Sequence, residues 1–581
     1  MKANDFGMAP RLRGNDDSKL FPGILPMCLG LVFLLSLTAC SEKSKTANGS
    51  AAKSETTGKT HLTVGIGQYP NTLHRSFTNM MSSTYAVAPM LRELTIYDDK
   101  SELVCRTCVT LPTIENGLAV LEATSDGKPG IAVTVQIHPE FSWGDGTPVT
   151  AEDFKLRWEI GRNLDVGSIA PSAFEPIYQF DVVDDKTFVL HYDEIKYSFN
   201  DLWLMPPIPS WLERSIYERD PETYKDRSLY TTDPTNPGLW NGPYRLERVT
   251  PGSELTLVRN PHWYGEQPHF DSVTLRAIEN TAALEANLLS GSIDMIAGQS
   301  NGLQIDQGIS FEKRHGSDYQ VLYTHKALLE LIIVQMKKNP VLADKRVRQA
   351  LLYALDREGI NQQLFAGKQP VAHIGDRRYD SVPEGVPQYN YDPQRAIALL
   401  EQAGWDNVKN GIRHNSAGEP LQFELLSTSG NKSRELIQQA IQAQLKAVGA
   451  DARIKNQTAR VFFGQSMRKR AFKALSLMGT SPTADRSYRP VHSSSYDGGK
   501  NAMGYNNPEV DRLVEAYEQE LDAAKRRQYA EQIMRIIREE VPVLLLYWRP
   551  RVDVLPLQLK GFRASGHKVP DTNWIEEWRW Q

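Results

Sequence analysis

The chain has 581 residues, too many for a single hydrophobic core, so we expect at least two lobes. Its composition, 40% hydrophobic and 23% charged residues, is typical of a soluble globular protein. A formal net charge of -4, with no basic run interleaved with aromatic residues, argues against a nucleic acid partner.

The N-terminus carries a basic region, then an apolar run at 21–37 that ends in Leu37-Thr38-Ala39-Cys40. This arrangement resembles the lipobox of a bacterial lipoprotein, in which the cysteine thiol is acylated and the preceding segment is removed. The resemblance implies a signal peptide at 1–39 and a lipid on Cys40. A membrane-spanning anchor is the alternative, but two prolines within the run and the polar SEKSK after it make it a poor span.

The segment after Cys40 contains no large apolar side chain up to residue 60, so it cannot pack into a core. We interpret 40–60 as the lipidated cysteine and a flexible tether, because a coil of about 20 residues would hold the body roughly 25 Å from its lipid. The strand-like HLTVGIG at 61–67 begins the folded body.

The mature chain keeps one possible cysteine pair, Cys105 and Cys108, since Cys28 lies in the signal peptide and Cys40 carries the lipid. Outside the cytoplasm we expect a disulfide, because a zinc site would need two more ligands. A redox C-x-x-C site is the alternative, but it works best with its first sulfur at a helix N-terminus. The apolar residues around the pair predict an extended connection instead.

Helices with clear boundaries follow. Thr150-Ala151-Glu152-Asp153 has the spacing of a capping box, and Asp392-Pro393 begins a helix that Gly404 ends. The segment 345–359 places its apolar residues on one helical face. Asn507-Pro508 predicts one long helix through Glu540. Apolar strands lie between these helices, at 421–427, 472–479 and 542–548. Strands that alternate with helices indicate an α/β architecture.

The segment 298–302 matches G-x-S-x-G, the pattern of a hydrolase nucleophile elbow around Ser300. Such an elbow needs a strand before it and a helix directly after it. The following stretch, 303–313, contains Gly308 and is a poor helix opening, so the pattern only weakly supports a hydrolase. The twelve histidines include no H-E-x-x-H and no pair at i,i+4, so we expect no metal site and no cofactor.

Several stretches together resemble one family. They are FSWGDGTPVTAEDFKLRW (141–158), NGPYRLERVTPGSELTLVRNPHWYG (241–265), LLSGSIDM (288–295), DKRVRQALLYALDREGI (344–360), YDPQRAIALLEQAGW (391–405), AIQAQLKAVGADARI (440–454) and GYNNPEVDRLVEAY (504–517). All resemble the bacterial extracellular solute-binding proteins of family 5, the peptide, dipeptide and nickel-chelate binding components of ABC importers. The matches run in family order from about residue 61 to 563.

The resemblance implies a large two-lobed periplasmic-binding-protein type II fold with a ligand cleft between the lobes. It places the two crossings between lobes near Glu279 and near Trp548. The implied division is lobe I at 61–96, 205–278 and 549–581, an extra subdomain at 97–204 beside it, and lobe II at 279–548.

The implied function is that of a receptor, not an enzyme. Anchored through Cys40 on the periplasmic or cell-surface side of the membrane, it would capture a small solute, a peptide first of all. Closure of the lobes would bury the solute, and the closed monomer would dock on the importer's permease subunits for transmembrane transport. The alternatives are a receptor for a sugar, opine or metal chelate, a receptor that signals without transport, and a thiol-disulfide oxidoreductase.

The resemblance also places the ligand contacts on two loops. The loop after the first strand, 71–83, contributes Thr78, Asn79 and Met80; the second-lobe stretch LSLMGTSPTADRSYRP at 475–490 contributes Met478, Ser481, Asp485 and Tyr488. Peptide binders often carry an Asp in an A-D-Y-like context in that second loop, where it holds the peptide's amino terminus. Asp485 is the nearest candidate but is shifted toward the C-terminus, and a solvated turn or helix cap is its alternative role.

Overall fold

The computed structural model describes residues 60–124, 126–481, 487–496 and 501–581. The predicted signal peptide, Cys40 and the tether up to residue 59 lie outside the described residues, as does Asp485. Within the described part of the chain, no helix is long and apolar enough to cross a membrane.

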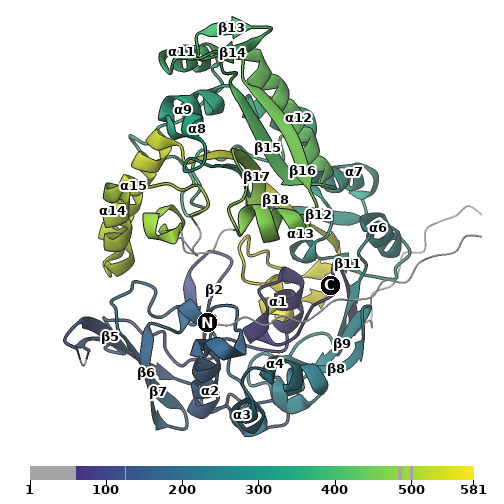
Figure 1. Ribbon diagram of the computed structural model, residues 1–581. Helices are drawn as coiled ribbons and strands as arrows, with labels where there is room; N and C mark the ends of the chain where they lie inside the picture. Colours follow the sequence, from purple (N-terminus) through teal and green to yellow (C-terminus); the bar gives the residue numbers. More distant parts are fainter. Residues whose placement is uncertain (1–59, 125, 482–486, 497–500) are drawn as a thin grey trace, which may run out of the picture. The chain divides into compact units, whose positions relative to one another are not determined.

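The largest sheet among the described residues has ten strands, and the fold is built around it (Figure 1). In sheet order its strands are β16 (Asp451–Gln457), β15 (Gln422–Thr428), β17 (Leu475–Thr480), β12 (Tyr319–Val334), β18 (Val543–Pro556), β11 (Met295–Ile296), β1 (His61–Ile66), β10 (Ser272–Ala277), β9 (Glu254–Arg259) and β8 (Tyr244–Thr250). β1 pairs in parallel with β10 and β11, and β15 pairs in parallel with β16 and β17. Each half of the sheet thus contains three parallel strands, with β1 in the middle of one set and β15 in the middle of the other.

The two longest strands, β12 and β18, connect these two ends. They pair antiparallel along their length, with Val321 opposite Val554 at one end and Ile332 opposite Leu544 at the other. The pairing is irregular between Thr324 and Leu328, where Lys326 adopts a left-handed φ of 57°. This irregularity divides both strands into two halves.

Two large hydrophobic clusters lie on either side of that division. One gathers residues of β1, β5 (Pro129–Gln136), β7 (Thr187–Tyr192), β8–β10 and the end of β18. The other gathers residues of β15–β17, the first half of β18 and the helices beside them. Two cores agree with the expectation that a chain of this length needs at least two lobes.

The first cluster also contains a four-stranded sheet. Its strands, in sheet order, are β4 (Ala119–Ala123), β5 (Pro129–Gln136), β7 (Thr187–Tyr192) and β6 (Ile177–Asp184). The short strand pairs are β2 (Thr95–Tyr97) with β3 (Leu103–Cys105), β13 (Asn407–Lys409) with β14 (Ile412–His414), and β19 (Leu559–Lys560) with β20 (Arg579–Trp580).

The α-helices of the described residues are interspersed with the strands along the chain. They are α1 (Met81–Val87), α2 (Ala151–Arg162), α3 (Ser210–Arg219), α4 (Tyr224–Arg227), α5 (Leu229–Thr232), α6 (Thr281–Leu289), α7 (Ile305–His315), α8 (Pro340–Ala343), α9 (Lys345–Tyr353), α10 (Arg357–Phe365), α11 (Pro393–Gln402), α12 (Lys432–Ala447), α13 (Ala459–Val461), α14 (Pro508–Gln519) and α15 (Ala523–Glu540). The predicted capping box at α2 is confirmed, with the Thr150 N–H donating to Asp153 Oδ2 at 3.0 Å.

Two helix predictions were wrong. The single helix predicted through Glu540 is two helices, α14 and α15, because Glu520 is extended and Asp522 caps α15 by accepting from the Lys525 N–H at 2.8 Å. The stretch after Ser300, judged a poor helix opening, forms α7, which the side chain of Gln307 caps by accepting from the Gln304 N–H at 3.0 Å.

The helical face predicted over 345–359 is buried as expected, but two helices share it. α9 ends before Ala354, and Asp356 begins α10 by accepting from the Gly359 N–H at 2.8 Å. Ala354 and Leu355, in the connection, are both buried. The apolar pattern therefore described the core correctly, although it did not reveal the break.

Candidate functional site

The loop after β1 holds the first three predicted contact residues, which differ in their environments. Thr78 is buried; its hydroxyl donates to Asn71 Oδ1 at 2.9 Å and accepts from the Met80 N–H at 3.1 Å. Asn79 is exposed, and Met80 is half-buried just before α1. Thr78 thus shapes the loop, while Asn79 and Met80 present accessible surface.

A buried histidine supports the same loop. His74 is 1% exposed, and its Nε2 lies 3.2 Å from the Tyr224 hydroxyl, which donates to Glu213 Oε2 at 2.7 Å. Burial, together with the nearby Arg157 guanidinium, lowers the pKa of His74 to about 3. The imidazole of His74, which supports the loop at 71–83, is therefore neutral.

The second predicted segment continues from β17. Met478 and Ser481 are half-buried, whereas Tyr488 is only 1% exposed. The Tyr488 hydroxyl donates to Asp376 Oδ2 at 2.9 Å, and its ring meets Tyr517 edge-on at 5.2 Å between centroids. Tyr488 is held in the core in this structure, and Met478 and Ser481 are the accessible members among those that the structure describes.

Sequence reasoning missed a cluster of charged residues beside β17. Arg434 of α12 donates from Nε and Nη2 to the two carboxylate oxygens of Glu330, at 3.1 and 2.9 Å, and the Arg549 Nε lies 3.2 Å from the same carboxylate. Burial alone would raise the pKa of Glu330, but the two guanidinium groups hold it below its usual value. The three residues come from three distant parts of the chain, so no local motif announces them.

A second buried charge cluster lies two residues further along β18. The Arg551 guanidinium contacts Asp553 Oδ2 at 3.2 Å and Asp571 Oδ2 at 2.7 Å. Asp553 also accepts from the Gly298 N–H at 2.6 Å, and Asp571 accepts from the Ser565 N–H at 2.9 Å. This cluster fixes the C-terminal segment and the turn at Gly298 to the sheet.

The loop at 374–381 contacts residues from several parts of the chain. Lys326, at the irregularity of β12, donates to the Arg377 and Tyr379 carbonyl groups at 3.1 Å each. Arg378 pairs with Asp376 at 2.8 Å. An open surface cavity of about 890 Å³ lies beside this loop and α15, and its lining contains none of the predicted contact residues.

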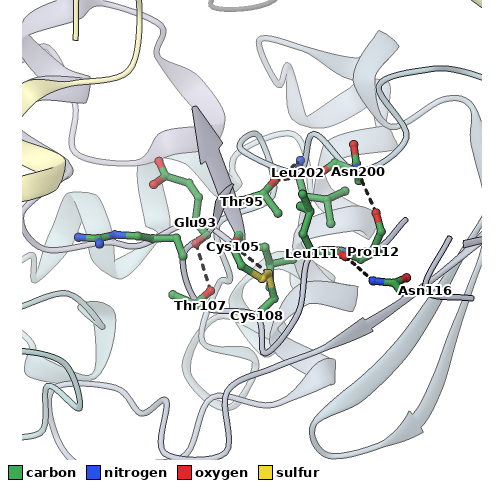
Figure 2. Close-up of a disulfide and its surroundings, with 12 residues drawn as sticks. Glu93, Thr95, Cys105, Thr107, Cys108, Leu111, Pro112, Asn116, Asn200 and Leu202 are labelled. Atoms are coloured by element: carbon green, nitrogen blue, oxygen red, sulfur yellow. Dashed lines mark hydrogen bonds between the residues drawn. A yellow bond between two sulfur atoms is a disulfide. The ribbon is translucent and has the colours of Figure 1, made fainter. Parts of the chain in front are cut away.

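Cys105 and Cys108 are joined by a disulfide with a Cα–Cα distance of 5.4 Å. Figure 2 shows it among hydrogen bonds that secure the surrounding segment: the Thr107 hydroxyl donates to the Glu93 carbonyl at 3.1 Å, and Thr95 accepts from the Leu202 N–H at 2.8 Å. Cys105 ends β3 instead of opening a helix, so the fold supplies no helix N-terminus to lower the pKa of its thiol.

Ser300 of the G-x-S-x-G pattern lies in a short 3-10 helix, Gly298–Ser300, and is fully buried. α7 does follow, but it starts only at Ile305, after Asn301 in a left-handed conformation. A buried hydroxyl cannot meet a substrate, so the geometry does not form a nucleophile elbow. Among the described residues, no group of three or more His, Cys, Asp or Glu is arranged to hold a metal ion.

Comparison with known families decides what kind of protein carries these sites. The model of the bacterial extracellular solute-binding proteins, family 5 Middle, matches residues 117–501, more than half of the chain. The chain belongs to family 5. Its fold is the α/β, two-lobed type II fold of such proteins, in which the ligand cleft lies between the lobes.

Individual relatives of this family 5 protein cover nearly the whole chain. The oligopeptide-binding protein AppA of Bacillus subtilis is 26% identical over 558 residues, which are 94% of this chain and 97% of AppA. The oligopeptide-binding protein of Thermus thermophilus, solved with a pentapeptide, is 25% identical with a TM-score of 0.70, over 90% of this chain and 96% of its own. NikZ of Campylobacter jejuni, solved with Ni(L-His), shares the fold at 20% identity and a TM-score of 0.72, over 90% and 99%.

Proposed function

We propose that this protein is the lipid-anchored, extracytoplasmic solute receptor of an ABC importer and that its solute is a peptide. The observation that carries the proposal is the family match over 117–501, in a chain whose two cores are connected by the long strands β12 and β18. A ligand that contacts both lobes favours the closed arrangement by its differential affinity for it. The closed form would then present its surface to the permease subunits.

Peptide is the favoured solute because AppA and the Thermus protein are oligopeptide binders by name and align over nearly their full length. A metal chelate is the second candidate, since NikZ with Ni(L-His) has the same fold. In either case binding alone is the function, and the disulfide-bonded Cys105 and Cys108 serve the structure and not redox catalysis.

The strand pairing supports a refined division into lobes. The resemblance places the first crossing near Glu279, but β11, which follows that residue, still pairs with β1. We therefore place the first crossing within β12 near Lys326, and the second in β18 near Trp548. The extra subdomain at 97–204, with its four-stranded sheet, stays beside lobe I.

The ligand contacts proposed are Asn79 and Met80 from lobe I, with Thr78 behind them, and Met478, Ser481 and Asp485 from lobe II. We assign Asp485 to the solute's ammonium group, where a charge-assisted hydrogen bond would fix orientation. Replacing Asp485 with Ala should weaken binding of free-amine peptides and leave N-acetylated peptides unchanged; equal affinities in both proteins would remove this assignment.

The test of the function is direct. The chain without residues 1–39, with Cys40 replaced by Ser, is unfolded and refolded to remove bound solute and is then titrated calorimetrically with defined tri-, tetra- and pentapeptides. Saturable binding with one site per chain supports the proposal. Absence of binding to every peptide, together with binding of Ni(L-His), would replace the peptide by the chelate.

A further inference from the structure

We propose that the Arg549 guanidinium binds a carboxylate group of the solute, with Glu330 and Arg434 as positioning residues. The inference rests on the proposed function and adds to it the chemical class of one ligand group. It is carried by the geometry of three side chains at the point where β17, β12 and β18 lie side by side.

Arg434 alone satisfies the hydrogen bonding of Glu330. Glu330 is 1% exposed, and the two parallel bonds from Arg434, at 3.1 and 2.9 Å, occupy both of its oxygens in the side-on geometry that guanidinium and carboxylate prefer. Arg434 is also anchored by Thr428, whose hydroxyl accepts from Nη1 at 3.3 Å. This pair is complete without Arg549.

Arg549 adds a positive charge in excess of the Glu330–Arg434 pair. Its Nε lies 3.2 Å from Glu330 Oε1, but this contact does not meet hydrogen-bond geometry. The charged groups that act on Arg549 are Glu330 and Arg434, so two cations share one anion. Among the described residues, the Nε of Arg549 is buried and has no hydrogen-bond acceptor, and the side chain as a whole is 17% exposed. Because Arg549 is mostly removed from water and shares its one anion with Arg434, a second anionic group beside it would be favourable.

The charge cluster lies next to the proposed lobe II contact segment. Gly479, which pairs with Glu330 across β17 and β12, lies so close that an added Cβ would come within 2.6 Å of Glu330 Oε1. Gly479 follows Met478 and precedes Ser481 by two residues, so the cluster borders the accessible part of the proposed lobe II contact segment. Arg549 itself lies beside Leu328, at the irregularity where β12 and β18 pass between the two cores.

The ligand group is a carboxylate because its planar pair of oxygens matches the guanidinium fork. In a peptide it comes from the C-terminus or from an acidic side chain. The Arg549 guanidinium would bind either carboxylate in the same way. Peptides that lack one of the two carboxylates distinguish between them.

The experiment compares the ligand-free wild-type chain with Arg549→Gln by calorimetry. The probes are a peptide with a free C-terminus, its C-terminal amide, and versions of both in which an internal Glu is replaced by Gln. Arg549→Gln removes the excess charge but keeps the Glu330–Arg434 pair, so the fold should be retained, and the melting temperature checks this. Exposed Arg453→Gln is the matched control, since it removes one guanidinium from the same half of the sheet.

In the wild type we expect loss of the recognised carboxylate to weaken binding roughly 10- to 100-fold, the range of a charge-assisted pair. Arg549→Gln should weaken the parent peptide by the same factor and abolish the difference between acid and amide, or between Glu and Gln. Arg453→Gln should behave as the wild type does. A difference in affinity between the C-terminal acid and its amide would identify the C-terminal carboxylate as the bound group. A difference between the Glu and Gln peptides would identify the side-chain carboxylate.

Two results would overturn the inference and leave the proposed function standing: peptides bind the wild type, but all four probes bind equally, or Arg549→Gln preserves the discrimination. If none of the four peptides binds the wild type, the peptide function itself fails, and the inference fails with it. Arg549→Lys provides a further test, because it keeps the positive charge but loses the planar guanidinium group. It should bind the parent peptide more tightly than Arg549→Gln does but less tightly than the wild type.

Discussion

The Arg377 guanidinium connects the loop after His373 to the segment that follows β2: Nη1 donates to Ser101 Oγ at 3.0 Å. Nη2 also approaches the Ser565 carbonyl at 3.4 Å. In the proposed division Ser101 and Ser565 belong to the lobe I side and Arg377 to lobe II. The contact therefore bridges the parts that must move when a solute is bound or released.

Replacing Arg377 with Ala should weaken solute binding by roughly 3- to 10-fold, because two interlobe hydrogen bonds that favour closure are lost. Calorimetry measures the affinity, and small-angle scattering measures the degree of closure with saturating ligand. Arg512→Ala, on the exposed surface of α14, is the control and should change neither. An Arg377→Ala protein with wild-type affinity would exclude a role for this contact in closure.

Replacing Cys105 and Cys108 together with Ser should lower the free energy of unfolding by about 1–2 kcal/mol, because the disulfide closes a very short loop. The hydrogen bonds of Thr95 and Thr107 around it remain. Solute affinity should be unchanged within about twofold, and the parent should lack disulfide reductase activity. Lost affinity in a folded variant, or reductase activity in the parent, would reopen the redox interpretation.

The buried His74 should make the free energy of unfolding depend on pH. Because its pKa falls to about 3 in the folded state, the unfolded chain binds more protons between that value and the ordinary histidine pKa. Its stabilising contribution is therefore complete above about pH 6.5 and decreases as the pH falls, by up to about 1.4 kcal/mol per pH unit. The difference in unfolding free energy between wild type and His74→Gln should shrink accordingly from about pH 7 to about pH 4.

The control for that measurement is His269→Gln, which alters an exposed histidine in a turn. It should keep the wild-type dependence on pH. A constant difference between wild type and His74→Gln across the range would show that the imidazole does not behave as its burial and the nearby Arg157 charge require.

Glu330→Gln should destabilise the fold by about 3–5 kcal/mol, because it leaves two buried guanidinium groups without their anion. Adding Arg549→Gln to this variant should restore part of the loss, since one uncompensated charge is removed. Denaturant unfolding measures both effects. Asp380→Asn breaks the Lys326–Asp380 pair, whose carboxylate is fully exposed, and should have little effect. Comparable losses at Glu330 and Asp380 would contradict the account of the buried cluster.

The parts of the fold that sequence reasoning predicted carry local signals. α2 and α11 begin at capping residues, and β1, β15, β17 and β18 are apolar runs, so each could be recognised within its own segment. The break between α14 and α15 also had a signal, because Asp522 is a typical N-cap residue, but the clear helix start at Asn507-Pro508 favoured a single helix.

The charge cluster had no such signal. Glu330 and Arg434 are 104 residues apart, and Arg549 is further along the chain, so only the sheet order brings them together. The burial of Tyr488 could not be read from its sequence neighbours either, because Asp376, its hydrogen-bond acceptor, comes from a distant loop. Family resemblance predicts the contact segments but does not reveal which side chains on them are accessible.

Native mass spectrometry of the protein purified from its own host tests the central claim most directly. The account predicts that the intact chain carries one noncovalent ligand whose mass, after release by denaturation, is that of a peptide or a set of peptides. A chain that carries no ligand in the native state and binds no peptide added to saturation, or one that releases only a non-peptide compound, would contradict it.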